Sequence, residues 1–124
     1  MYYQLPFKTG RYVVEQIGDH PNGALVQILA VIHHPKQGDL HAPGATDVFF
    51  HERKALAYRE KRIVHPNLLK PFEDEVPDYN ESLKAAVLRL EAKLQTEDTD
   101  YNKQALKMIG NLKEEYSHYN QLQF

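Results

Sequence analysis

The spacing of hydrophobic residues changes near the middle of the chain, and this change predicts two structural parts. In residues 1–72, short apolar runs are separated by turn residues, which is typical of β-strands. Residues 8–17 are rich in β-branched and aromatic side chains, and residues 24–32 are apolar at almost every position. Because a strand with one wet face would alternate, we expect residues 24–32 to be covered on both faces. Pro21-Asn22-Gly23 predicts a hairpin turn between these strands, with Asn-Gly suited to type I′.

Three further segments complete the first half. Residues 47–50 read as another strand, and residues 53–62 are ambiguous between a strand pair and a short helix. Residues 63–72 predict a strand, a tight turn at Pro66-Asn67 and a last short strand. Five short strands with long irregular loops favour a small SH3-like β-barrel, with a fragment of a β-sandwich as the alternative.

The second half has the three- and four-residue spacing of amphipathic helices. Asp78 is the predicted N-cap of the first helix, with Glu81 three residues later. Thr99 is the predicted cap of the second helix, with Asp100 in its first turn. The apolar stripe of the first helix comprises Tyr79, Leu83, Ala86, Leu90 and Leu94. That of the second comprises Tyr101, Ala105, Met108, Leu112, Tyr116 and Tyr119. The short connection makes the pair an antiparallel helical hairpin.

These patterns together predict an α+β fold in which a barrel of residues 1–72 is followed by a helical hairpin of residues 73–124. The hairpin leaves apolar surface uncovered, and the outer face of residues 24–32 lacks a cover. Each part supplies what the other lacks, so we expect the hairpin to pack on the barrel and the two to form one cooperative unit.

Charge is divided between the same two parts. Residues 1–72 hold nine Lys/Arg and six Asp/Glu, whereas residues 73–124 hold six Lys/Arg and eleven Asp/Glu. The halves therefore carry +3 and −5, consistent with the net charge of −2. No apolar run approaches the roughly 20 residues of a membrane span. The first residues lack the basic and apolar regions of a signal peptide. With no cysteine in the chain, these features indicate a cytoplasmic protein.

A histidine-rich stretch, residues 33–54, holds the candidate chemistry. Imidazoles with carboxylates can bind zinc or iron, but the spacing here matches no strong metal signature. We therefore expect no metal and no cofactor, and interpret the histidines as groups that hydrogen-bond loop backbone. If a metal did bind, its candidate ligands would be His33, His34, Asp39, His41 and His51.

The same region suggests two further activities. Acid–base catalysis by His51 with Asp39 or Glu52 has the residue types, but the chain shows no nucleophile elbow, phosphate loop or metalloprotease motif. We expect no enzyme. Nucleic-acid binding is suggested by cations around Tyr58, namely Arg53, Lys54, Arg59, Lys61 and Arg62. Glu52 and Glu60 lie among them and the chain is acidic overall, which argues against phosphate binding.

Protein recognition fits the composition better. The chain has 8 tyrosines in 124 residues, and tyrosine suits interfaces because it offers apolar area with a polar tip. Tyr79, Tyr101 and Tyr116 are expected to pack within the helical stripes. The predicted partner surface is instead the histidine-rich loop with the segment after it, and comprises His41, His51, Arg53, Lys54, Tyr58 and Arg59.

Three blocks of sequence carry a resemblance to a known family. HHPKQGDLHAP, DVFFHERKALAYRE and LLKPFEDEVPDYNESL resemble the kinase-associated protein B family of spore-forming Gram-positive bacteria. The resemblance implies an SH3-like barrel with a carboxy-terminal helical hairpin and brings no catalytic residues. It also implies a non-enzymatic regulatory protein that modulates a membrane sensor histidine kinase feeding the sporulation phosphorelay.

The resemblance also affects the expected cellular location of the protein, and two alternative functions stay open beside it. The family name often includes "lipoprotein", yet this chain has no cysteine, so we expect no lipid anchor by that route. We expect no direct membrane insertion, and any place at the inner membrane face would come through the kinase. The alternatives are a nucleic-acid-binding SH3-like module and, after it, a His/Asp metal-dependent enzyme. The sequence indicates no oligomeric state.

Overall fold

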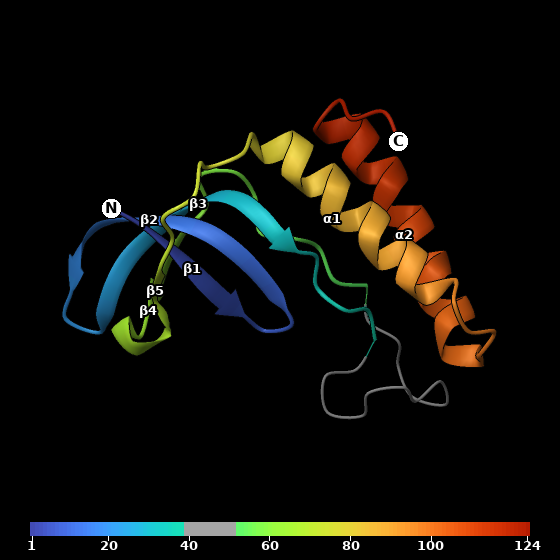
Figure 1. Ribbon diagram of the computed structural model, residues 1–124, viewed down its shortest axis with the longest axis horizontal. Helices are drawn as coiled ribbons and strands as arrows, with labels where there is room; N and C mark the ends of the chain where they lie inside the picture. The colour runs from blue at the N-terminus through green and yellow to red at the C-terminus, as the bar shows by residue number, and fades with distance from the viewer. Residues whose placement is uncertain (39–51) are drawn as a thin grey trace.

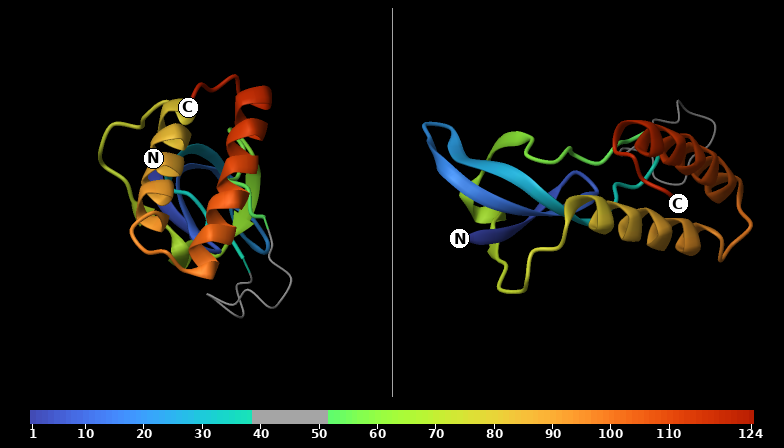
Figure 2. Two further views of the ribbon diagram at one scale, coloured as in Figure 1. Left: turned by 90° about the vertical axis from the view of Figure 1, so that its right-hand side faces the viewer. Right: turned by 90° about the horizontal axis from the view of Figure 1, so that it is seen from above.

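The computed structural model describes residues 1–38 and 52–124. Its strands are β1 (Tyr2–Phe7), β2 (Gly10–His20), β3 (Gly23–His33), β4 (Lys61–Val64) and β5 (Lys70–Pro71). A short 3-10 helix, η1 (Pro66–Leu68), joins β4 to β5, and the helices α1 (Tyr79–Leu94) and α2 (Asp100–Tyr119) follow. Figures 1 and 2 show the sheet at one end of the molecule and the two helices, side by side and oppositely directed, at the other. The predicted α+β class and helical hairpin are confirmed.

The described strands form one antiparallel sheet in the order β4-β3-β2-β1-β5. The edge strands β4 and β5 are linked through η1, and no ladder of hydrogen bonds joins them, so the described sheet is open. A closed SH3-like barrel is therefore not confirmed. The reason lies in β5, which pairs only through Lys70 and Pro71 with β1, and a proline has no N–H to extend a ladder.

The β1 strand was absent from the sequence prediction, although its residue Leu5 is fully buried. Pro6 hides the strand, because a proline inside a run argues against a central strand. In the structure β5 pairs with β1 only at Tyr3 and Gln4. Pro6 consequently lies where β1 has a ladder on one side only, so its missing donor costs no hydrogen bond there.

The β2–β3 hairpin is present, but its turn differs from the prediction. His20 pairs with Gly23, so the two-residue loop is Pro21-Asn22. Neither loop residue has positive φ, which excludes type I′. Along β3 fully buried and half-buried positions alternate from Gly23 to Ala30, so one face is covered completely and the other only in part, where the prediction expected cover on both faces. The helices cover only its end, where Val31 N–H donates to Ser82 Oγ over 3.0 Å.

The remaining strand predictions have mixed outcomes. The predicted strand at residues 47–50 lies outside the described residues. Residues 52–60 contain neither a helix nor a strand, and β4 begins only at Lys61. The strand–turn–strand prediction for residues 63–72 is confirmed by β4, η1 and β5.

Both helices begin at their predicted caps. Asp78 accepts from Glu81 N–H over 3.1 Å and Thr99 accepts from Asn102 N–H over 3.1 Å. The stripe of α2 is wrong at one position, since Tyr119 is 73% exposed. Tyr119 is the last residue of α2. Ile109, which the predicted stripe omitted, is fully buried, because it lies four residues after Ala105 on the same face. Neither helix of the described chain has the length and hydropathy that crossing a membrane requires.

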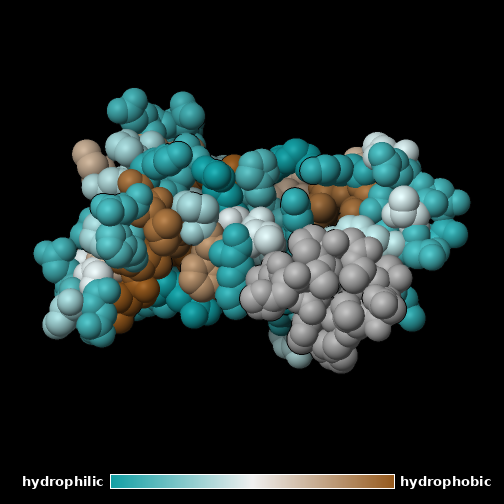
Figure 3. Space-filling model, turned by 90° about the horizontal axis from the view of Figure 1, so that it is seen from below, coloured by the Kyte–Doolittle hydropathy of each residue, from teal (hydrophilic) through white to brown (hydrophobic). Residues whose placement is uncertain are grey.

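One hydrophobic cluster runs from the sheet into the helices. It includes Tyr12 and Ile28 from the sheet, Leu56 from the segment between them, and Leu83 and Ile109 from the helices. The continuity of this cluster supports a proposal that the two parts unfold together. A separate apolar surface lies over the β4 and β5 end of the sheet (Figure 3), and Ile63 and Leu68 are among the exposed apolar residues.

Leu83→Ala is expected to lower the free energy of unfolding by about 2–5 kcal/mol, because it removes a fully buried side chain. The matched control is Leu88→Ala, on the same helix at 39% exposure, with an expected change within about 0.5 kcal/mol. Sheet and helix amide signals, followed by NMR in urea, should share one midpoint in each variant. Separate midpoints for the sheet and the helices would contradict the single unit.

Candidate functional site

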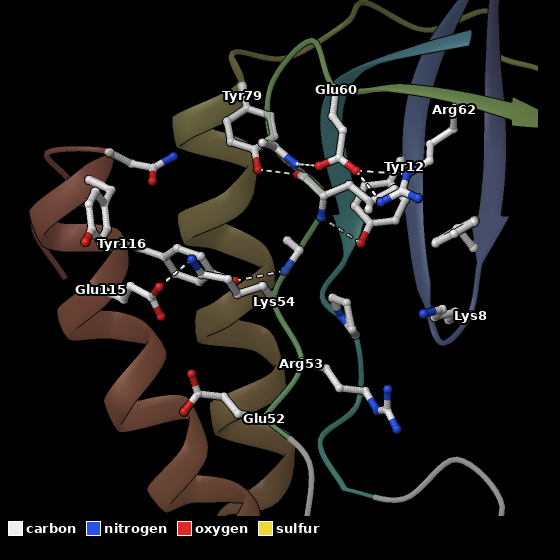
Figure 4. Close-up of a pocket in the computed structure, with 17 residues that line it drawn as sticks. Lys8, Tyr12, Glu52, Arg53, Lys54, Glu60, Arg62, Tyr79, Glu115 and Tyr116 are labelled. Carbon is white, nitrogen blue, oxygen red and sulfur yellow. Dashed lines mark hydrogen bonds and ion pairs between the residues drawn. The ribbon is translucent and has the colours of Figure 1, made fainter. Parts of the chain in front are cut away.

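Three buried tyrosine hydroxyls hold residues 52–60, which we call the central segment, between the sheet and the helices. Leu56 N–H donates to the Tyr12 hydroxyl over 3.2 Å, and the Tyr79 hydroxyl donates to the Leu56 carbonyl over 2.5 Å. Ala55 N–H donates to the Tyr116 hydroxyl over 3.0 Å. Figure 4 shows these side chains converging from β2, α1 and α2 on the central segment. Tyrosine side chains thus satisfy backbone groups that a sheet ladder would otherwise satisfy.

His34 extends this network and has a defined tautomer. Its Nδ1 lies 2.9 Å from the Pro35 carbonyl, which can only accept, so Nδ1 carries the hydrogen. The Tyr116 hydroxyl then donates to Nε2 over 2.8 Å while accepting from Ala55 N–H. Burial lowers the pKa of His34 to about 4, so the ring is neutral at pH 7. Burial also raises the pKa of Tyr116, which keeps its proton available for donation.

Gln37 fixes the start of the central segment. Arg53 N–H donates to Gln37 Oε1 over 2.8 Å, and Gln37 Nε2 donates to the Arg53 carbonyl over 2.9 Å. The Gln37 carbonyl accepts from the Tyr101 hydroxyl over 2.8 Å, and Arg53 Nε donates to the Gly38 carbonyl over 2.9 Å. Part of the Arg53 guanidinium is therefore committed within the protein.

The far end of the central segment forms a sharp, strained turn. Glu60 N–H donates to the Ala57 carbonyl over 3.0 Å, and Arg59 has φ of 65°. Arg59 and Glu60 together oppose Ile28, since Arg59 N–H donates to the Ile28 carbonyl and Ile28 N–H donates to the Glu60 carbonyl. This two-against-one pairing is a β-bulge, and the positive φ position of such a bulge after a turn is usually glycine. Here it is an arginine.

The turn presents an aromatic–cationic pair, which we call the tip (Tyr58 and Arg59). The Arg59 guanidinium lies 5.2 Å from the centroid of the Tyr58 ring, within cation–π range. The Tyr58 ring packs in turn on Tyr79, with centroids 5.7 Å apart, yet remains 50% exposed. Tyr79 thus supports the tip with its ring and holds Leu56 with its hydroxyl.

A cleft of about 460 Å³ lies between the central segment, the β1–β2 turn and the end of α2 (Figure 4). Its rim carries charges of both signs, and most of the cations have partners. Lys54 pairs with Glu115, and Arg62 pairs with Glu60 over 2.5 Å. Lys8, which also borders a second hollow across the β1–β2 turn, and Arg53 line the cleft, and neither is in an ion pair with a described carboxylate. The lining of the cleft is therefore mixed, with charged side chains beside apolar and aromatic ones such as Phe7, Leu56 and Tyr119.

The structure separates the residues predicted for partner binding. Arg53 and Lys54 line the cleft, whereas Tyr58 and Arg59 form the tip at the other end of the central segment. His41 and His51 lie outside the described residues. Sequence reasoning missed Tyr12 and Gln37 as supports, and treated Tyr79 and Tyr116 as packing residues only. The helical spacing of Tyr79 and Tyr116 predicts that their rings are buried, but it does not predict which group each hydroxyl hydrogen-bonds.

The histidines within the described chain are placed poorly for metal binding. His34 has protein partners on both ring nitrogens. His33 lies at the exposed end of β3, where burial and then the charges of Arg89, Arg11 and Lys93 lower its pKa. Those cations would repel a metal ion. Across residues 1–38 and 52–124, no group of three or more candidate ligands is gathered, and Asp39, His41 and His51 lie outside these ranges.

Comparison with known proteins identifies the family. The chain resembles a crystal structure of kinase-associated protein B from Bacillus cereus, with a TM-score of 0.77, 30% identity and 94% of each chain covered. It is also 45% identical over 111 residues to the kinase-associated lipoprotein B of Bacillus subtilis (strain 168), covering 89% of this chain and 87% of that protein. The model of the family named kinase associated protein B matches residues 7–117. The chain belongs to the kinase-associated protein B family, as its sequence blocks predicted.

Tyr79→Phe is expected to cost about 1–3 kcal/mol, because it leaves the buried Leu56 carbonyl without its donor. Tyr119→Phe is the matched control, since Tyr119 is 73% exposed, and should change stability by less than about 0.5 kcal/mol. Urea unfolding followed by circular dichroism measures both. Equal stability of the two variants would show that the hydroxyl is not what anchors the central segment.

His34 is expected to make stability fall as the pH is lowered. Its pKa is depressed from 6.5 to about 4, so between these values the unfolded chain binds a proton that the folded protein does not. The loss between pH 6.5 and 4 is roughly 3 kcal/mol, at 1.36 kcal/mol per pKa unit.

The measurement is the free energy of unfolding in urea from pH 7 to pH 4, for wild type and His34→Gln. The variant should be less stable at pH 7, and its deficit should shrink as the pH falls. His33 is present in both proteins, so its contribution cancels. Parallel pH profiles would contradict the neutral, buried state assigned to His34.

Proposed function

We propose that this protein is a non-enzymatic regulatory protein that associates with a kinase through the tip and the adjoining cationic residues. Family membership supports the kinase, because the matched family and the Bacillus subtilis relative are both named as kinase-associated. The proposed contact comprises His41, His51, Arg53, Lys54, Tyr58 and Arg59. Specifically, we propose that the partner is a membrane sensor histidine kinase feeding the sporulation phosphorelay. Binding to this kinase would hold the cytoplasmic protein at the inner membrane face.

The observation that carries the surface assignment is the backbone of Arg59. An L-residue with φ of 65° costs about 1–2 kcal/mol relative to its preferred conformations, whereas glycine adopts this region freely. Strain of this kind is concentrated at functional sites. The turn therefore carries a conformational cost at a residue whose side chain is exposed and lies on an exposed tyrosine.

The frame beneath the tip suits recognition. Tyr79 supports the Tyr58 ring, and the bulge pairs Arg59 with Ile28 in β3, so the tip is held before a partner arrives. Held side chains lose less entropy on binding. Arginine and tyrosine are also the residues enriched at the energetic centres of interfaces. The guanidinium fits an acidic group of the kinase, onto which it can fork with two hydrogen bonds.

The nucleic-acid alternative has weaker support. Two of the cations that suggested it, Lys54 and Arg62, are paired with Glu115 and Glu60. Phosphate binding would have to displace those carboxylates. The exposed tip is a single arginine beside Glu60, which is a small charge for a backbone that binds through several phosphate contacts.

Arg59→Gly gives a sharp test, because it relieves strain and removes the guanidinium together. We expect stability to rise by about 1 kcal/mol and the Kd for the kinase to weaken roughly tenfold or more. The kinase would first be captured from native cells by crosslinking, then purified. Calorimetry would measure binding, and a labelled RNA oligonucleotide would serve as the second ligand.

The matched control is Gln121→Gly, because Gln121 also has positive φ, at 57°, and follows the C-cap of α2 outside the central segment. It should be neutral or stabilising and should bind the kinase as wild type does. Wild-type kinase binding by Arg59→Gly, with loss of binding by Glu114→Lys, would move the contact to the outer face of α2. Salt-sensitive RNA binding lost in Arg59→Gly would favour the nucleic-acid function instead.

A further inference from the structure

A second surface, on another side of the junction between sheet and helices, is a hollow lined by cations. It has a volume of about 490 Å³ and lies between the β1–β2 turn, the end of β3, residues 34–36 and α1. Five cationic side chains line it, and we call it the cationic hollow: Lys8, Arg11, Lys36, Arg89 and Lys93. They come from four separate elements, which the fold brings together; the sequence places them up to 85 positions apart.

No carboxylate balances these charges within the described chain. The residues that line the cationic hollow include no Asp or Glu, and the ion pairs of the described residues use Lys54, Arg62, Lys103 and Lys113 instead. Arg89 and Lys93 are also four residues apart on α1, where like charges destabilise a helix. The like charges therefore disfavour the folded state slightly, and an anion in the hollow would offset this cost.

The walls of the cationic hollow are fixed by hydrogen bonds. The Arg89 guanidinium donates to the Ile32 carbonyl over 2.6 Å, at the end of β3. Lys36 N–H donates to Thr9 Oγ1 over 2.8 Å, which ties residues 34–36 to the β1–β2 turn. The first bond orients the Arg89 guanidinium, so this group loses less entropy when an anion binds than a free surface side chain would; the second holds only the backbone of Lys36.

The backbone of the β1–β2 turn points to the same use. The turn has two loop residues, Lys8 and Thr9, between the paired Phe7 and Gly10. Lys8 has φ of 54°, and a positive φ at the first loop residue of such a hairpin strongly favours glycine. Glycine would serve the turn better, but it would remove one of the five cations.

His33 reports the positive potential of this region. Its exposed ring adjoins the hollow, and after burial the causes that lower its pKa are Arg89, Arg11 and Lys93. Lys8, from the turn, and Lys36, from the following segment, complete the charged groups on the surrounding walls. A bound anion would offset these charges and raise the pKa of His33, which makes its imidazole a local probe of occupancy.

We propose that the cationic hollow binds a small phosphorylated molecule that carries two or more negative charges. Arg11 and Arg89 can each fork onto phosphate oxygens, and the lysines supply further charge. The volume falls in the range of small-ligand sites, larger than one phosphate ion needs. A concave site of this size fits a discrete ligand better than the extended surface of a membrane.

The test is calorimetric titration with inorganic pyrophosphate at constant ionic strength, with sodium chloride as the background salt. Wild type should bind one equivalent saturably. Lys93→Glu and Lys36→Gln should each weaken binding at least tenfold, because each removes a lining charge. Lys107→Glu, on the exposed side of α2, is the matched control and should stay within twofold of wild type. Thermal melts confirm that each variant is folded.

Two further measurements make the outcome decisive. The pKa of the His33 ring, followed by NMR, should rise when pyrophosphate is added. In the other arm, vesicles with anionic lipid should bind no more tightly to wild type than to Lys93→Glu. Saturable binding that both hollow variants leave unchanged, or that Lys107→Glu weakens equally, would overturn the proposal. Tight vesicle binding lost in Lys93→Glu would assign the hollow to a membrane surface and also overturn it.

Discussion

The structure depends on hydrogen bonds between tyrosine hydroxyls and a stretch of backbone that has no strand partner. Leu56 and Ala55 pass between the sheet and the helices, where unpaired peptide groups would each cost about 1–3 kcal/mol. Tyr12, Tyr79 and Tyr116 satisfy them, one hydroxyl from the sheet and two from the helices. The same contacts join the two parts and position the central segment, so one set of interactions determines both the fold and the site.

Two cationic features use this frame in different ways. The tip is convex, and Arg59 stacks on an exposed tyrosine. The cationic hollow is concave, and its charges come from separate elements. Both contain a cation at a backbone position where glycine is the usual residue, Arg59 in one and Lys8 in the other. Positive charge is thus kept at a conformational cost in two places of a chain whose net charge is −2.

The parts of the fold that local spacing determines were predictable, and those that depend on distant partners were not. Asp78 and Thr99 identified both helix starts because a cap acts within one turn. The β1 strand was not predicted, because a proline within the strand, Pro6, argues against a strand. A closed barrel would require hydrogen bonds between β4 and β5, and no pattern in the sequence indicates whether two distant strands pair. At the site, sequence reasoning selected Arg59 by charge. It could not find the Tyr79 support, because the donor and the Leu56 carbonyl lie 23 positions apart.

The edges of the sheet have a consequence for behaviour at high concentration. At one edge β5 is two residues long and contains Pro71, and at the other β4 begins with Lys61 and Arg62. Short strands, proline and like charges prevent a neighbouring molecule from extending a ladder. Runaway polymerisation through backbone pairing is therefore blocked at both described edges. Association between copies at these edges would have to occur through side-chain contacts and not through backbone hydrogen bonds. Such contacts form only between complementary surfaces.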